Sequence, residues 1–161
     1  MTAARIKHLK KVIDASNIDL IDPAMAEIYQ CDTLAQLASV HIDAYSEHGA
    51  VRKAKFHKMA KRQLKRLANS ILLAPGSYDI RSNKGGIAVT GEITLHGHRL
   101  YVQVSQSCFG ARGEILYRYC NGRTDYTGGP NNYAEIGELD NHEEFARKLR
   151  RAHQFGLVEL A

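Results

Sequence analysis

The chain has 161 residues but no Trp, only three Pro and only three Cys. Cys31, Cys108 and Cys120 are odd in number and form no CxxC pair, which argues against a disulfide framework or a structural zinc site. No apolar run approaches the ~20 residues that cross a bilayer. The opening MTAARIKHLKK lacks the apolar stretch of a signal peptide. We therefore expect a cytoplasmic protein with reduced thiols, no membrane contact, no metal and no cofactor.

Acidic residues are missing from one long stretch, because no Asp or Glu occurs between Glu47 and Asp79. Within this gap, residues 50–72 carry eight Lys or Arg, whereas residues 73–161 carry ten basic and ten acidic residues. One segment thus holds more than the whole net charge of +5. The length fits a single domain over 1–161, with a helical part over 1–74 and a sheet part over 75–161.

Helical spacing dominates the first half of the chain. It predicts a surface helix over residues 3–14 and, after the capping pair Asp22-Pro23, a short helix over 24–30. A third helix is expected to follow Asp32 and to end at Gly49 as a left-handed cap. Its predicted apolar face consists of Leu34, Leu37, Ala38, His41 and Tyr45.

A fourth helix is predicted from about Ala50 to Leu72, ended by Pro75-Gly76. At about 100° per residue, one side of this helix is apolar and the opposite side is cationic. The apolar side consists of Phe56, Ala60, Leu64, Leu67 and Ile71. The cationic side extends over roughly 16 Å of helix, with Lys55, Lys58, Lys61, Arg62, Lys65 and Arg66 on or beside it.

From Ser77 the apolar residues alternate, which predicts strands near 78–82, 87–95, 100–104 and 114–120. A hairpin turn at His96-Gly97 or Gly97-His98 places the apolar residues of the second and third strands on the same face. Residues 121–139 have no period and are predicted to form a long loop. Asn141 and Glu144 then cap a last helix with Phe145, Leu149 and Ala152 on its apolar face.

The expected fold is therefore α+β, with a helical N-terminal half packed on a four-stranded antiparallel β-meander and a C-terminal helix. Four basic residues end the last helix, where cations favour the helix dipole. They are Arg147, Lys148, Arg150 and Arg151. This structural explanation suffices for them.

The cationic helix face has three interpretations. It can bind the phosphates of DNA or RNA with strong salt dependence, dock on an acidic protein surface, or only keep the chain solvated. Phosphate binding is favoured because no acid intervenes, and Lys84 and Arg112 at one end of the sheet are expected to extend the surface. No residue of the helix stands out as a base reader, so sequence specificity stays unassigned.

The other end of the meander offers an enzymatic alternative. We expect the hairpin turn to bring His96 and His98 near Asp125 in the long loop, with Arg123 and Tyr126 beside it and Asn131 and Asn132 within reach. Two imidazoles and a carboxylate can bind a divalent metal or act in acid–base chemistry on a phosphodiester. No metal motif of known spacing is present, however, and a tight hairpin explains His-Gly-His equally well.

We expect, on balance, a nucleic-acid-associated accessory or regulatory protein that binds phosphates and has no chemistry of its own. One alternative is an inhibitor or adaptor that docks on an acidic partner. The other is a small metal-dependent phosphodiesterase or nuclease built on His96, His98 and Asp125.

Overall fold

The computed structural model of the chain describes residues 22–85, 91–106 and 113–154. Its helices are α2 (Pro23–Gln30), α3 (Leu34–Ser39), α4 (Glu47–Ser70), the 3-10 helix η2 (Ile136–Asn141) and α5 (His142–Gln154). Its strands are β1 (Asp79–Asn83), β2 (Glu92–His96), β3 (Leu100–Gln106), β4 (Gly113–Gly122), β5 (Asp125–Gly128) and β6 (Asn132–Glu135). The predicted α+β class is confirmed. The helix predicted over 3–14 lies outside the described residues.

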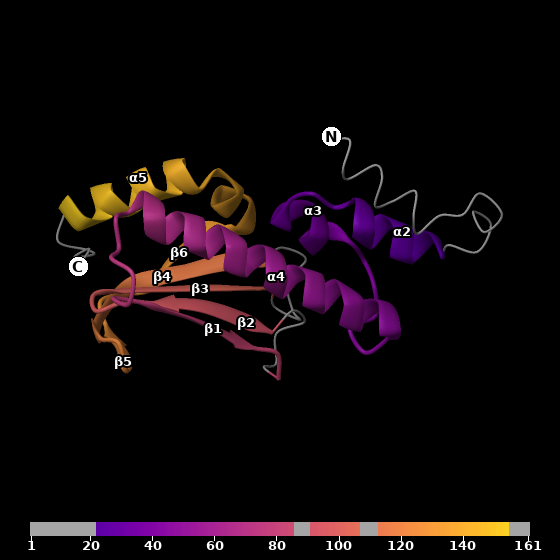
Figure 1. Cartoon of the computed structure of the whole chain (residues 1–161), viewed down its shortest axis with the longest axis horizontal. Helices are drawn as coiled ribbons and strands as arrows, with labels where there is room; N and C mark the ends of the chain where they lie inside the picture. Colours follow the sequence, from indigo (N-terminus) through magenta and orange to yellow (C-terminus); the bar gives the residue numbers. More distant parts are fainter. Residues whose placement is uncertain (1–21, 86–90, 107–112, 155–161) are drawn as a thin grey trace.

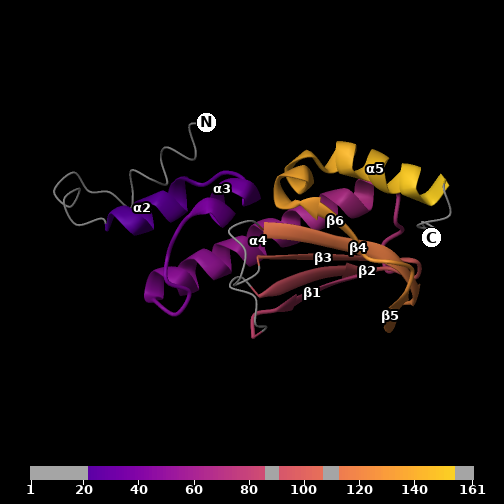
Figure 2. The same ribbon diagram turned by 180° about the vertical axis from the view of Figure 1, so that it is seen from behind.

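Strands β1 to β4 form the predicted antiparallel meander, and β6 adds a further strand beside β4. The strand β5 pairs with the end of β4. Figure 1 shows α4 and α5 side by side over one face of the sheet, while β5 bends away on the opposite side. The view from behind in Figure 2 shows the same two layers.

The register of β2 and β3 confirms that their apolar residues share a face, because Ile93 pairs with Val104 and Leu95 with Val102. The turn itself lies further along the chain than predicted. His96 still pairs with Tyr101, and the Gly97 amide donates to the Leu100 carbonyl at 2.9 Å. The two central residues of the turn are therefore His98 and Arg99. This shift preserves the alternation of faces, so the core is unchanged.

The helix predicted to end at Gly49 ends earlier. Helix α3 stops at Ser39 and Val40 is extended, which leaves His41 exposed and Tyr45 98% exposed. Gly49 lies instead in the first turn of α4, where its amide donates to the Ser46 side chain at 3.0 Å. The prediction was wrong because Ser46 starts a new helix. Glycine is needed there since a Cβ would overlap the carbonyl oxygens of Asp43 and Ala44.

The apolar side predicted for α4 is confirmed, because all five of its residues are buried: Phe56, Ala60, Leu64, Leu67 and Ile71. They pack on the sheet face formed by Ile93, Leu95, Val102, Val104 and Ile115, whose side chains are fully buried. The helix ends at Ser70, and Leu72 takes a left-handed φ of 65° before Pro75.

The segment predicted as a long loop, 121–139, contains β5, β6 and the start of η2. Each of these strands has only four residues, and in β6 only Ala134 is buried. Strands this short show too little alternation of apolar and polar residues to be predicted from the sequence. The cap predicted for the last helix is confirmed. The Glu144 amide donates to Asn141 Oδ1 at 3.4 Å, and Asn141 Nδ2 donates to the Glu144 carboxylate at 2.8 Å.

No helix in the described part of the chain is both long and apolar enough to cross a bilayer.

Candidate nucleic-acid interface

The side of α4 opposite the core exposes a row of cations. Five side chains, which we call the α4 cation face, are exposed: Lys58, Lys61, Arg62, Lys65 and Arg66. Within the described ranges none of them forms an ion pair with a carboxylate. Arg66 has one long hydrogen bond, to Gln63 Oε1 at 3.5 Å. The charge on this face is therefore accessible and is not neutralised by another described part of the fold.

Lys55, also expected on this face, has a structural partner. Its side chain is half-buried, and its Nζ donates to the carbonyls of Ile28 at 2.6 Å and Tyr29 at 3.0 Å. These carbonyls belong to the last turn of α2, where a cation favours the helix dipole. Lys55 therefore joins α2 to α4 and has little freedom left to follow a phosphate.

Arg52, in the same basic run, is buried with only 4% of its surface exposed. It donates to the Val40 carbonyl through Nη1 at 2.9 Å and to Gln106 Oε1 through Nη2. Gln106 in turn donates to the Ala38 carbonyl at 2.7 Å. Burial lowers the pKa of the Arg52 guanidinium. These bonds fasten α4 to β3 and to the segment after α3, so Arg52 stabilises the fold and does not face a ligand.

Of the two cations expected to extend the surface, only Lys84 lies within the described residues. Lys84 is exposed in the turn after β1. Its Cα lies close to Gly91, which also approaches the buried His57 of α4. Lys84 thus lies at the sheet end beneath the first half of α4. Arg112 lies outside the described residues.

At the other end of the sheet, the structure brings Asp125 near His96, as predicted. The His96 side chain is 4% exposed, its ring meets the Tyr101 ring edge-on with centroids 5.3 Å apart, and the backbone carbonyls of Gly122 and Asp125 face it. Burial lowers the pKa of His96, although these carbonyls oppose the shift. His98 is exposed in the turn.

The polar neighbours expected around this pair have other partners. The Asp125 carboxylate accepts from the Thr127 hydroxyl and amide, which lower the pKa of Asp125. Arg123 Nη2 lies 2.9 Å from Asp79 Oδ2, and this bond lowers the pKa of Asp79. Asn131 accepts from Arg118 at 2.9 Å, and Asn132 donates to the Pro130 carbonyl. Nothing is described of the Tyr126 side chain.

In the described ranges, no three His, Cys, Asp or Glu side chains are grouped as a metal site requires. Cys31 and Cys120 are buried free thiols, and burial raises the pKa of each, which disfavours the reactive thiolate. Cys108 lies outside the described residues. The geometry thus adds no support to the phosphodiesterase alternative.

Sequence reasoning assigned the basic end of α5 to the helix dipole, but the fold sets this helix beside α4. Arg150 donates to the Ser70 carbonyl at the end of α4, and Arg147 and Arg151 are exposed. Only the packing of two helices distant in sequence reveals that their cations share one side of the molecule. The sequence of the segment between α4 and α5 does not indicate that the two helices pack side by side.

Comparison of the chain with known proteins found no matching protein-family model, no matching curated protein and no matching solved structure.

Proposed function

We propose that this protein binds the phosphate backbone of nucleic acid through the α4 cation face, as an accessory or regulatory protein without chemistry of its own. The observation that supports the proposal is a row of five exposed cations, none in an ion pair with a carboxylate in the described ranges. An unpaired cation row on a rigid helix can displace the counterions condensed on a nucleic acid, and that release drives binding.

Rigidity strengthens this interpretation. The buried side of α4 packs on the sheet, and Arg52 and Lys55 tie the first half of the helix to its neighbours. The exposed cations therefore project from a fixed rod, so binding a phosphate costs side-chain entropy but no ordering of the backbone. No residue of this row stands out as a base reader, which favours binding that is independent of sequence.

The test is the salt dependence of affinity, measured by fluorescence anisotropy with a labelled oligonucleotide. If each of the five cations contacts one phosphate, the plot of log K against log salt has a slope of about −4.5 for duplex DNA. Neutralising two of them in a Lys58→Gln/Arg62→Gln variant reduces the magnitude of that slope by about 1.8. A matched control for a single charge compares Arg62→Gln with Arg81→Gln, because Arg81 pairs with Asp79 at 3.2 Å on β1.

The control variant is expected to bind like the wild type. Equal loss in Arg62→Gln and Arg81→Gln would show that only net charge matters, and absent binding would refute the proposal. The protein could instead fail to bind nucleic acid but bind an acidic protein, with the same sensitivity to Lys58→Gln/Arg62→Gln. That result would replace nucleic-acid binding with the adaptor function.

A further inference from the structure

Helix α5 runs beside α4 in the same direction. Gln63 in the middle of α4 donates at 3.4 Å to Asp140 in η2, two residues before α5 begins. Near the other ends, Arg150 of α5 donates to the Ser70 carbonyl of α4. Both views show the two helices over the same face of the sheet (Figures 1 and 2). The sides of α4 and α5 that point away from the sheet therefore lie on the same side of the molecule.

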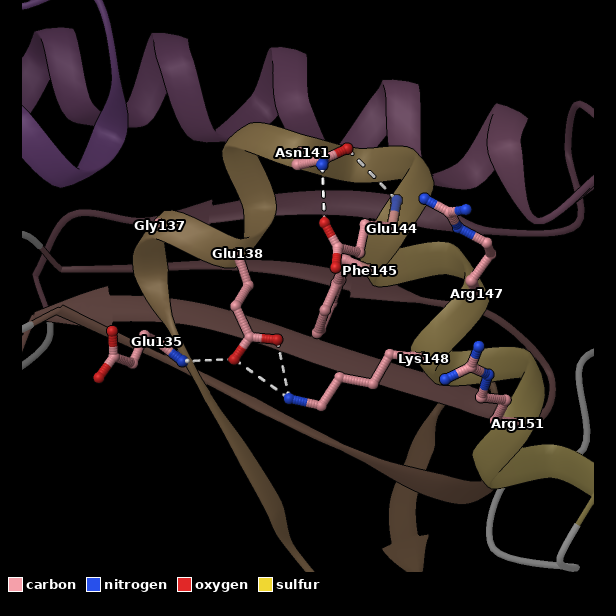
Figure 3. A pocket seen from close by; sticks show the side chains of 9 residues that line it. All are labelled: Glu135, Gly137, Glu138, Asn141, Glu144, Phe145, Arg147, Lys148 and Arg151. Carbon is pink, nitrogen blue, oxygen red and sulfur yellow. Dashed lines mark hydrogen bonds and ion pairs between the residues drawn. The ribbon is translucent and has the colours of Figure 1, made fainter.

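The outer side of α5 carries its own pair of cations. Phe145, Ala146 and Leu149 are buried, whereas Arg147 and Arg151 are exposed one helical turn apart and form no ion pair within the described ranges. They lie at a cavity of about 690 Å³ between η2 and α5. Figure 3 shows both arginines on the α5 side of this cavity, apart from the ion pair between Lys148 and Glu138 at 2.8 Å.

Within the described ranges, the exposed sides of α4 and α5 also carry no Tyr, Phe or Trp. The large apolar side chains exposed in the described ranges are Tyr29, Tyr45, Leu72 and Tyr133, and none belongs to either helix. Proteins that bind single strands commonly stack the bases on aromatic rings. A surface with cations but no rings suits instead a nucleic acid whose bases are already stacked within a duplex.

We infer that the partner is double-stranded nucleic acid, with the α4 cation face on one phosphate backbone and Arg147 and Arg151 on the other. This inference rests on the proposed function. Packed helices lie about 8–10 Å apart, between the widths of the two grooves of B-DNA, about 6 and 12 Å. The helix separation matches neither width, so the Lys and Arg side chains of two adjacent helices must splay or converge to reach the two backbones that border a groove.

The acidic residues of α5 limit the contact to the second half of the helix. Glu143 is exposed in its first turn and repels phosphate there, whereas Glu144 is held by Asn141. Removing the Glu143 charge is therefore expected to tighten binding. The substitution Glu143→Gln leaves the cap formed by Asn141 and Glu144 intact.

The experiment compares one labelled sequence as a duplex and as a single strand at equal salt. If both forms bind equally at 1 M salt, the different slopes for duplexes and single strands with seven phosphate contacts correspond to about 25-fold tighter duplex binding at 0.1 M salt. Arg147→Gln/Arg151→Gln should reduce the magnitude of the duplex slope by about 1.8. Glu143→Gln should raise duplex affinity. Arg81→Gln should change neither the duplex affinity nor the duplex slope.

Equal or tighter binding of the single strand would overturn this inference, as would an unchanged duplex slope in Arg147→Gln/Arg151→Gln. Either result leaves the proposed function standing if Lys58→Gln/Arg62→Gln still weakens binding. Failure of the wild-type protein to bind either form would overturn both.

Discussion

The buried contact between Arg52 and Gln106 predicts a strong energetic coupling. Arg52 reaches β3 from α4, and each partner also holds one backbone carbonyl, of Val40 and Ala38 respectively. We consider Arg52→Met and Gln106→Leu, which keep most of each side chain's volume, and the double variant. Each single change leaves a buried polar group without its partner, whereas the double change removes both side-chain polar groups together.

The magnitudes follow from what each variant leaves behind. Arg52→Met deprives the Val40 carbonyl and Gln106 Oε1 of donors, at about 1–3 kcal/mol each, partly offset because a charge no longer has to be buried. Gln106→Leu leaves a buried guanidinium with one acceptor fewer and the Ala38 carbonyl without its donor, at about 1–3 kcal/mol each. Of the partners described above, the double variant leaves the Val40 and Ala38 carbonyls unpaired. Its cost should therefore fall below the sum of the single costs by about 2 kcal/mol.

Urea denaturation followed by circular dichroism gives the free energy of unfolding for all four proteins. A matched control pairs Arg52→Met with Arg81→Gln, two sites on opposite layers of the fold, whose effects should add within about 0.5 kcal/mol. If Arg52→Met and Gln106→Leu also add within about 0.5 kcal/mol, the reasoning on this buried contact is refuted.

Three further predictions follow from particular residues. Gly49→Ala should destabilise the protein, although Ala normally favours a helix over Gly by about 1 kcal/mol, because its Cβ would meet the Asp43 carbonyl; a higher urea midpoint would contradict this. The lowered pKa of His96 means that the unfolded chain binds the proton more readily, so stability should fall as pH drops below about 6.5; this part of the pH dependence should vanish in His96→Phe, and a persisting slope would exclude His96 as its source. In Arg123→Met the pKa of Asp79 should rise toward its ordinary value, because the Arg123 hydrogen bond is the main cause of its lowering; carboxyl NMR titration measures it, and an unchanged pKa would rule that bond out as the cause.

The sequence predicts α4 well because one signal covers six turns of helix. Apolar residues recur at the helical period and every charge between them has the same sign, so the buried and exposed sides can be assigned with no knowledge of the rest of the fold. The meander and the face of its apolar residues are predictable for the same reason, since alternation over several residues fixes which side is buried.

What escaped prediction depends on partners far away in the sequence. Arg52 and Lys55 belong to the same basic run as the exposed cations. Arg52, however, donates to Gln106 and Lys55 donates to a carbonyl at the end of α2, so neither side chain is fully exposed. Gly49 was assigned to the wrong helix because a close backbone approach and a left-handed cap both favour glycine. Arg147 and Arg151 enter the proposed interface only because α5 lies beside α4.

Lysine acetylation, measured by mass spectrometry with and without a nucleic-acid duplex, tests most directly whether the α4 cation face is the binding surface. The chain supplies internal controls, because Lys55 is held by two carbonyls and Lys148 by Glu138. We predict that the duplex protects Lys58, Lys61 and Lys65 and leaves Lys55 and Lys148 unchanged. Unchanged reactivity at Lys58, Lys61 and Lys65 with duplex bound would contradict the account.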